Sequence, residues 1–419
     1  MKRVKRICSA VLSLFLAFSF TACSGSGGGF YGGGDYYKGD IAEGEMEGVE
    51  NGENTESQVV QKPAGLMTAG AWNDNDNYDF WKTLFEQNGE GTGKFFSYFG
   101  ERSWGFNSYN RIKVTVQNGE NPVAGAKVVC KNQAGEVVFK AVSDAVGVAY
   151  VFTDELTGVV EATSGSFSAN ADFTAENRDL TLSLTDSEPK QDVIELSFVV
   201  DVTGSMGDEI SFLQNELVDV ISRVSTTNPQ TQINLSMLFY RDYTDKEVFK
   251  YYDFVDVTTS EGLASQVSAI KTQLANGGGD YPEAVSDALE RAVNQQWSSN
   301  TTTKIIFHVL DAPPHSNDTN RTKFYSAVKQ AAEKGIRICP IICSGAAELT
   351  EYLMRQAAIY TGGTFVFVTD DSGIGNPHHD PDLPNVTVEA LNSLMVRLIN
   401  GYHIGEFAPP VNWRDEVKE

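Results

Sequence analysis

Cysteine and histidine are scarce in this 419-residue sequence, which contains five residues of each. After Cys23 only Cys130, Cys339 and Cys343 remain, and the last two stand on one expected strand. Residues four positions apart on an extended strand are separated by about 13 Å, which is too far for a disulfide. We therefore expect no disulfide framework and three buried free thiols.

Basic residues are also few, since 32 Lys and Arg stand against 56 Asp and Glu, for a formal net charge of −24. A surface with this balance repels a phosphate backbone, so nucleic acid is not an expected partner. Divalent cations and basic protein surfaces suit it better.

The apolar stretch from Ile7 to Phe20 is too short and too isolated for an ordinary membrane span. It follows the basic segment "MKRVKR" and ends at "FTAC", which resembles the lipobox of bacterial lipoproteins except at Phe20, where leucine is usual. The resemblance implies a signal peptide at residues 1–23 and a lipidated Cys23; the alternative is a plain secretory signal with a chance cysteine. The chain would be exported and held by lipid on the outer face of the bacterial cytoplasmic membrane or cell surface.

Residues 24–63 are rich in glycine and acid, which predicts a disordered tether. Residues 64–110 contain much aromatic mass, so we expect a small ordered segment docked on a neighbouring domain. Its acids Asp74, Asp76 and Asp79 lack the glutamate that an EF-hand loop requires. They are interpreted as a solvated turn rather than a Ca²⁺ site.

Residues 111–186 show strand patterns such as "RIKVTVQ", separated at short spacing by Gly, Asn and Asp. This pattern predicts a small all-β sandwich domain. The stretch "NPVAGAKVVCKNQAGEVVFKAVSDAVGVAYVF" resembles the carboxypeptidase-regulatory-like and collagen-adhesin B-type modules of bacterial surface proteins. Some such modules carry a Lys–Asn isopeptide bond, for which Lys113 and Asn177 are the pair to test; the preferred interpretation is two ordinary surface residues.

Strands and helices alternate from residue 192 to residue 403. The segment "VIELSFVV" is almost continuously apolar, as expected for a strand buried on both faces of a parallel sheet. A helix with one apolar stripe follows, "EVFKYYDFV" predicts an edge strand, and further strands and helices come after it. We predict an α/β fold with a doubly wound, mostly parallel sheet, and a C-terminal tail at 404–419.

Acidic and hydroxyl side chains follow the expected strands at the edge where ligands bind in such sheets. Asp201, Thr203 and Ser205 come after the first strand, Asp280 stands in "GGGD" before a helix, and Asp311 follows "IIFHVL". These oxygens, with no thiolate or well-spaced histidine among them, suit a hard cation, with Mg²⁺ preferred to Ca²⁺ or Mn²⁺. The alternative is that the acids and hydroxyls only cap the helices that follow them, with Asp280 as an N-cap.

Five segments together resemble von Willebrand factor type A domains and their metal-ion-dependent adhesion site: "DVTGSMGDEI", "FYRDYTD", "GGGDYPEAV", "VLDAPPH" and "TGGTFVFVTDDSGIG". The resemblance implies a Rossmann-like fold over the alternating segment. It also implies that Thr203 and Ser205 bind the metal directly, while Asp201 and Asp311 accept hydrogen bonds from its waters. Thr203 replaces the usual serine and the family's loop threonine is absent, so Asp280 would stand in for it. The loops are similar to the branch of the family found beside alpha-kinases.

Two further groups lie near these strand ends. Arg241 and Asp242 are interpreted either as part of the rim of the site or as a simple ion pair, and His315 is a third rim candidate. His378 and His379 could suggest zinc together with His315. Adjacent histidines point apart in an extended chain, so they are interpreted as solvated loop residues.

The expected function is divalent-cation-dependent binding or adhesion at the cell surface, in which the metal holds an acidic group of a protein or another carboxylate-bearing ligand. An enzyme is not expected, because the sequence has no Gly-x-Ser-x-Gly elbow, Walker loop or kinase signature set. Thr203 also stands where an aspartyl-phosphate phosphatase needs a second Asp. The alternatives are a Mg²⁺-dependent hydrolase or phosphoryl-transfer enzyme, and a structural component of an envelope assembly.

Overall fold

The computed structural model describes residues 67–87, 91, 93–98, 104–343, 345–370, 381 and 383–416, all within one compact unit, Lys62–Glu419. The predicted signal peptide, Cys23, the tether and the pair His378 and His379 lie outside the described residues.

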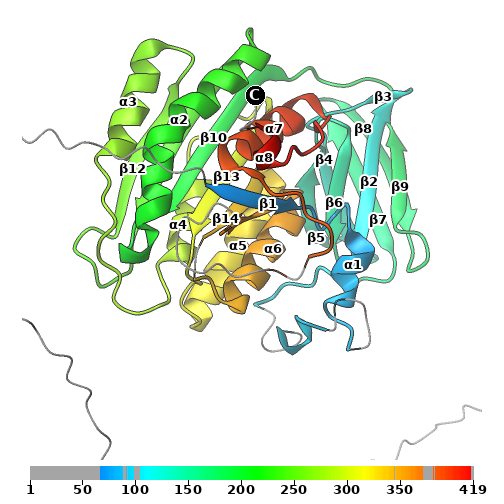
Figure 1. Ribbon diagram of the computed structural model, residues 1–419. Helices are drawn as coiled ribbons and strands as arrows, with labels where there is room; N and C mark the ends of the chain where they lie inside the picture. Colours follow the sequence, from blue (N-terminus) through cyan, green and yellow to red (C-terminus); the bar gives the residue numbers. More distant parts are fainter. Residues whose placement is uncertain are drawn as a thin grey trace, which may run out of the picture. The chain divides into compact units, whose positions relative to one another are not determined.

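The largest sheet has eight strands in the order β12-β11-β10-β13-β14-β15-β1-β16 (Figure 1). Its strands, from that first edge to the other, are β12 (Phe249–Asp256), β11 (Gln232–Tyr240), β10 (Gln191–Asp201), β13 (Thr301–Leu310), β14 (Arg337–Ile342), β15 (Phe365–Thr369), β1 (Thr68–Trp72) and β16 (Glu389–Ala390). β11, β10, β13, β14 and β15 run parallel, and β12 pairs antiparallel at one edge. The predicted doubly wound, mostly parallel sheet and its edge strand are confirmed.

Helices cover both faces of this sheet because its central strands are apolar on both sides. Along β10, Ile194, Leu196, Phe198 and Val200 pack into one core cluster and Val199 packs into the other. The first cluster also contains buried side chains of the helices on that face, α2 (Gly207–Thr227), α3 (Ser260–Lys271) and α7 (Leu391–Ile404). The second includes α4 (Val285–Val293), α5 (Asp318–Lys334) and α6 (Glu348–Thr361).

The aromatic N-terminal segment supplies a strand that its sequence did not predict. β1 inserts between β15 and β16 and runs antiparallel to both. The segment continues through α1 (Tyr78–Thr83) and the short 3₁₀ helix η1 (Phe96–Tyr98). Its aromatic rings pack on α6, where Tyr352 stacks on Tyr98 with ring centroids 4.4 Å apart.

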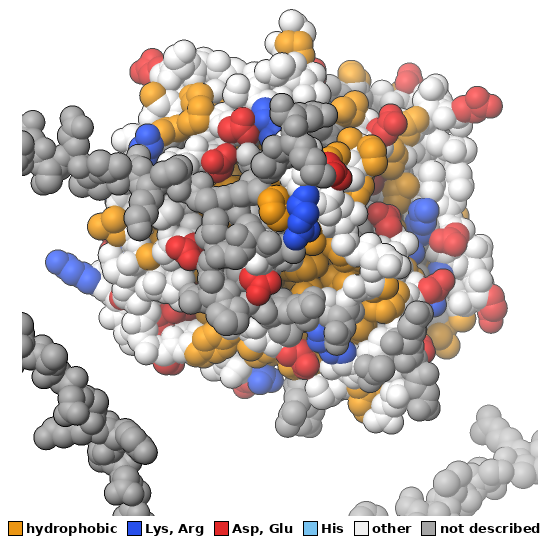
Figure 2. Space-filling view, viewed as in Figure 1, with side chains coloured by type: hydrophobic (Ala, Val, Ile, Leu, Met, Phe, Trp, Pro, Cys, Tyr) orange, Lys and Arg blue, Asp and Glu red, His pale blue; other side chains and the backbone are white. Residues whose placement is uncertain are grey.

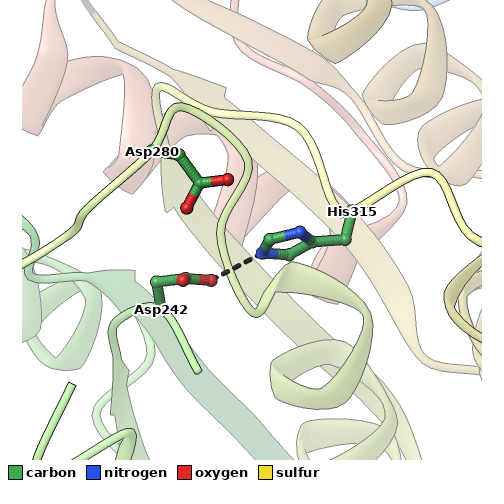
Figure 3. Close-up of side chains that lie close together, drawn as sticks. All are labelled: Asp242, Asp280 and His315. Carbon is green, nitrogen blue, oxygen red and sulfur yellow. Dashed lines mark hydrogen bonds and ion pairs between the residues drawn. The ribbon is translucent and has the colours of Figure 1, made fainter. Parts of the chain in front are cut away.

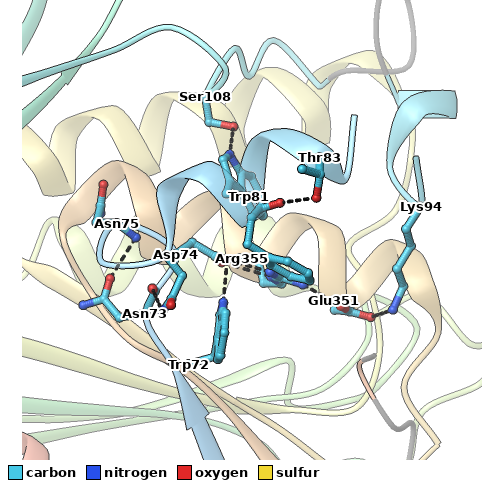
Figure 4. Close-up of polar contacts among 12 residues, drawn as sticks. Trp72, Asn73, Asp74, Asn75, Trp81, Thr83, Lys94, Ser108, Glu351 and Arg355 are labelled. Carbon is cyan, nitrogen blue, oxygen red and sulfur yellow. Dashed lines mark hydrogen bonds and ion pairs between the residues drawn. The ribbon is translucent and has the colours of Figure 1, made fainter. Parts of the chain in front are cut away.

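Arg355 of α6 holds this segment in place through a buried polar network (Figure 4). Its guanidinium donates to both carboxylate oxygens of Asp74, at 2.9 and 2.5 Å, and to Glu351 at 3.0 Å. Glu351 also accepts a hydrogen bond from Lys94 at 2.8 Å. Asp74 is therefore a buried ion-pair partner, and its interpretation as a solvated acid is wrong.

Residues 111–186 form a β-rich module of two four-stranded sheets. One sheet contains β2 (Arg111–Asn118), β3 (Asn121–Pro122), β6 (Val148–Phe152) and β9 (Asp179–Ser183); the other contains β4 (Lys127–Asn132), β5 (Val137–Val142), β7 (Gly158–Ser164) and β8 (Phe167–Phe173). The module packs on α5 and α6, and the ring of Phe152 stacks on Tyr360 of α6 with centroids 4.5 Å apart. Lys113 and Asn177 are both exposed.

Cys130, Cys339 and Cys343 are buried free thiols, as expected. Within the described ranges, no helix is both long and apolar enough to span a bilayer. Acidic side chains are scattered over the face drawn in Figure 2 rather than gathered into one patch.

Candidate functional site

The parallel strands bring three acids to one edge of the sheet. Asp201 ends β10 and pairs in register with Tyr240, the last residue of β11. Asp242 follows β11, and Asp311 follows β13. Because parallel strands end at the same edge, these acids meet in the loops above the sheet.

Asp201 fixes the loop that follows it. Its Oδ1 accepts hydrogen bonds from the Thr203 backbone N–H at 2.9 Å and from Thr203 Oγ1 at 2.7 Å. The 3₁₀ helix η3 (Gly204–Met206) begins at this turn and leads into α2. The side chain of Ser205 lies beside Asp311, where it favours the ionised form of that carboxyl. The structure therefore brings together all four residues that the sequence predicted at the ends of β10 and β13.

The triple-glycine loop closes over this turn in a way that requires glycine. The Gly204 N–H donates to the carbonyl of Gly277 at 3.2 Å, and the Gly278 N–H donates to Asp245 Oδ2 at 2.9 Å. Gly277 and Gly278 have φ of +77° and +76°, which L side chains rarely adopt. A Cβ at Gly277 would overlap the carboxylate of Asp245.

An open cleft of about 530 Å³ lies between these loops. It is lined by Thr203, Gly204, Ser205, Gly277, Gly278, Gly279, Asp280, Tyr281, Glu283, Asp311, Ala312 and Gly345. The Tyr281 hydroxyl bridges two sides of the rim, since it donates to the carbonyl of Asp311 at 3.2 Å and accepts from the Ala347 N–H at 2.7 Å.

Glu283 is a site residue that the sequence analysis missed, although it stands in the quoted segment "GGGDYPEAV". Its side chain lines the cleft but is only 4% exposed. Pairing of its backbone N–H with the carbonyl of Pro313, at 3.0 Å, holds it beside the loop after β13. The available signal in the sequence was an acid three residues after Asp280, shortly before a predicted helix.

The buried acids repel one another. Burial, then repulsion by Asp311, raises the pKa of Asp201 to about 7. Burial and repulsion by Asp201, Asp242, Asp311 and Asp245 raise the pKa of Glu283 to about 9. Burial also raises the pKa of Asp311, against the lowering effect of Ser205. Ionised together, these acids give the cleft a strongly negative charge, which a cation would offset.

The donor set fits a hard divalent cation. Asp201 Oδ2 and Glu283 Oε2 are buried, and neither has a hydrogen-bond partner among the described residues. Buried polar atoms are almost always partnered, so two orphaned carboxylate oxygens beside hydroxyl groups point to a ligand. Carboxylate and hydroxyl oxygens are the ligands that Mg²⁺ and Ca²⁺ prefer.

Asp280 occupies a different place from the one expected. It is exposed, and α4 begins only at Val285 with Ala284 as its N-cap, so Asp280 is not a helix cap. Its carboxylate points toward Asp242 and His315 (Figure 3). The substitution of Asp280 for the family's threonine stays a prediction.

The two other rim candidates, Arg241 and Asp242, form hydrogen bonds with different partners. Arg241 donates to the backbone carbonyls of Asn276, at 2.9 Å, and Leu274, at 3.1 Å, and so supports the glycine loop. Asp242 instead accepts a hydrogen bond from His315 Nε2 at 2.6 Å. Burial raises the pKa of Asp242, but hydrogen bonds from His315 and from backbone N–H groups outweigh it and lower the pKa below its usual value.

We expect Gly278→Ala to weaken Mg²⁺ binding roughly tenfold, because the added Cβ would lie 3.0 Å from Glu283 Oε1 and 3.2 Å from Thr203 Cβ. The positive φ should also cost about 1–2 kcal/mol of unfolding free energy. Gly119→Ala is the matched control, since Gly119 has φ of +61° but no atom within 4 Å of the added Cβ. It should lose similar stability in thermal melts and keep the Mg²⁺ affinity. Equal Mg²⁺ affinities for the two variants would contradict this account of the loop.

The sheet, the strand-end oxygens and the cleft define a Rossmann-like domain with a candidate cation site. Residues 195–370 match the family model described as von Willebrand factor A domain. The chain therefore contains a von Willebrand factor A domain, as the sequence motifs predicted.

Two curated relatives match parts of the chain. A protein of Acanthamoeba polyphaga mimivirus named as an ariadne-like RING finger protein is 35% identical over 225 residues, which is 49% of this chain and 20% of that protein. An alpha-protein kinase of Dictyostelium discoideum is 26% identical over 125 residues, 30% of this chain and 19% of the kinase. The chain thus spans about one fifth of the length of each relative.

Solved structures resemble the chain only distantly. The PilB minor pilin from Streptococcus sanguinis has a TM-score of 0.37 at 11% identity, covering 71% of this chain and 94% of that one. The pilus adhesin SpaC from Lactobacillus rhamnosus GG has a TM-score of 0.36 at 10% identity, covering 60% and 35%. BatB from Bacteroides thetaiotaomicron has a TM-score of 0.34 at 15% identity, covering 50% and 98%. Scores this low carry no conclusion about function.

Proposed function

We propose that this chain is a non-enzymatic, cation-dependent binding protein whose von Willebrand factor A domain binds an acidic group of a partner through a bound cation. The observation that carries the proposal is the pair of buried, unpartnered carboxylate oxygens, Asp201 Oδ2 and Glu283 Oε2, beside an open cleft. A divalent cation would satisfy these oxygens and offset the mutual repulsion of the acids.

The hydroxyl groups of Thr203 and Ser205 would bind the cation directly, and Asp201 and Asp311 would hold its waters. From the glycine loop, we favour Glu283 over Asp280 as the additional ligand, because Glu283 has the buried unpartnered oxygen and Asp280 is exposed. The bound cation, Mg²⁺ in the first place, supplies the positive charge that attracts a carboxylate of a protein or other ligand.

The cleft supports binding rather than catalysis. The residues that line it contain no histidine, cysteine or lysine, and the proposal assigns its hydroxyl groups and buried carboxylates to the cation rather than to a nucleophile and a general base. Tyr281, which is 46% exposed at the rim, offers an aromatic surface of the kind that protein interfaces favour.

We further propose that the chain acts at the bacterial cell surface. The support is the basic segment, the short apolar stretch and "FTAC" in the first 23 residues. Lipid attached at Cys23 would anchor the protein, and residues 24–63 would hold the binding domain away from the bilayer.

Asp201→Ala tests the proposal. We expect this variant to bind Mg²⁺ roughly 10–100-fold more weakly in calorimetric titrations, because Asp201 positions both Thr203 and the cation's waters. Asp318→Asn, which removes an exposed carboxylate at the start of α5, should bind like the wild type. Wild-type Mg²⁺ affinity in Asp201→Ala would overturn the site. Turnover of phosphoesters by the Mg²⁺-loaded wild type would overturn the non-enzymatic role.

A further inference from the structure

A second group of ligand atoms lies beside the cleft. Asp242 comes from the loop after β11, Asp280 from the glycine loop, and His315 from the loop after β13. One ligand atom of each lies within 4.8 Å of the other two. Figure 3 shows the three side chains directed at a common point. In the part of the chain that the structure describes, no other trio of His, Cys, Asp or Glu is gathered this tightly.

Two of the three side chains are already fixed. Asp242 is 1% exposed and accepts the hydrogen bond from His315 Nε2 at 2.6 Å. The Asp245 carboxylate accepts from the Asp242 backbone N–H at 3.2 Å, which fixes the loop that carries Asp242. The His315 ring packs beside Tyr243 with centroids 5.2 Å apart. Asp280 is exposed, so an ion could enter from its side.

The ligand types differ from those of the Mg²⁺ site. One imidazole and two carboxylates suit borderline transition ions such as Zn²⁺ and Co²⁺, whereas the cleft offers oxygen ligands alone. The buried Glu283, which we assign to the Mg²⁺ site, adds negative charge beside this group. Glu283 is 4% exposed, its Oε2 has no hydrogen-bond partner among the described residues, and Asp242 acts on it electrostatically.

We propose that Asp242, Asp280 and His315 form a second cation site, which takes a divalent transition-metal ion. The ion takes the place of the hydrogen bond between His315 Nε2 and Asp242, the imidazole keeps its one proton on Nδ1, and water or a partner completes the coordination. Asp280 then belongs to this site, and the Mg²⁺ site consists of Asp201, Thr203, Ser205, Asp311 and Glu283. The second site goes beyond the proposed binding function and does not depend on it.

The test uses the full-length chain, stripped of metal and then held in excess Mg²⁺. Titration with Co²⁺, followed by visible absorption, should show one equivalent that Mg²⁺ does not displace. His315→Ala and Asp280→Asn should weaken that binding about 100-fold. Asp201→Ala and Asp318→Asn should retain it, and thermal melts should confirm that all variants are folded.

Three results would overturn the second site. The first is wild-type Co²⁺ affinity and an unchanged Co²⁺ spectrum in His315→Ala, which would show that His315 is only a hydrogen-bond donor to Asp242. The second is loss of the Co²⁺ signal in Asp201→Ala, which would place the ion in the Mg²⁺ cleft. The third is complete displacement by Mg²⁺. Failure of Mg²⁺ binding in the wild type would overturn the proposed function while leaving the Co²⁺ result to stand.

Discussion

Arg355→Ala should lower the free energy of unfolding by about 3–5 kcal/mol, because it leaves the buried Asp74 without its cationic partner and leaves Glu351 with Lys94 in place of two cations. Arg355 is 1% exposed, and both Asp74 and Glu351 are at most 2% exposed. Its guanidinium also lies 5.1 Å from the centre of the Trp81 ring, so alanine removes packing as well as charge. Urea or thermal unfolding of the purified chain measures the loss.

Arg223→Ala is the matched control for this substitution. Arg223 is also on a helix and pairs with Asp219 at 3.4 Å, but its side chain is 42% exposed. An exposed pair of this kind contributes about 0.2–1 kcal/mol. A loss in Arg355→Ala no larger than in Arg223→Ala would contradict the assigned role. Hydrogen exchange should also rise selectively in β1 of Arg355→Ala, since Asp74 follows that strand directly.

The sequence did not predict strand β1, which leads into the segment that Arg355 holds in place, and the reason is physical. "TAGAW" has no clear period-2 alternation, and Thr68 is its only β-branched residue. It becomes a strand because β15 offers it an edge, and its Gly70 fits against the Phe367 ring where a Cβ would clash. By contrast, the residue patterns of "VIELSFVV" and "EVFKYYDFV" predicted a buried strand and an edge strand, and both segments form these strands, β10 and β12.

The residues of the candidate site were likewise predicted only in part from the sequence. Sequence spacing predicted which acids would meet, because strand ends of a parallel sheet share one edge. It did not distinguish Asp280 from Glu283, which stand three residues apart in one loop. That distinction depends on the direction of the chain after Gly277 and Gly278, and their positive φ turns Glu283 inward while Asp280 stays exposed. His315 was linked in the sequence to distant histidines, whereas its partner in space is Asp242.

The metal-free protein should lose stability as the pH rises from about 5 to about 9. Asp201 and Glu283 have ordinary pKa values of 3.8 and 4.5, and in the folded protein these become about 7 and about 9. A raised carboxyl pKa means that the folded state binds more protons than the unfolded state across this window. Stability is therefore greatest below the unfolded values and falls as each folded pKa is passed. The change in the pKa of the fully buried Asp201, from 3.8 to about 7, corresponds to on the order of 4 kcal/mol.

Glu283→Gln tests how much of the loss of stability toward pH 9 comes from Glu283. Glutamine keeps the shape of Glu283 but cannot ionise, so the metal-free variant should be more stable than wild type at pH 9 and similar to it at pH 5. Saturating Mg²⁺ should stabilise the wild type most at high pH, where both acids are charged and the cation neutralises them, and should stabilise the variant less. Glu406→Gln, at an exposed position, should behave as wild type. Thermal melts at pH 5 and pH 9, with EDTA or Mg²⁺, supply all four comparisons. If Glu283→Gln and wild type respond alike to pH and to Mg²⁺, Glu283 is not a ligand, and the cation must be held by the residues of β10 and β13 alone.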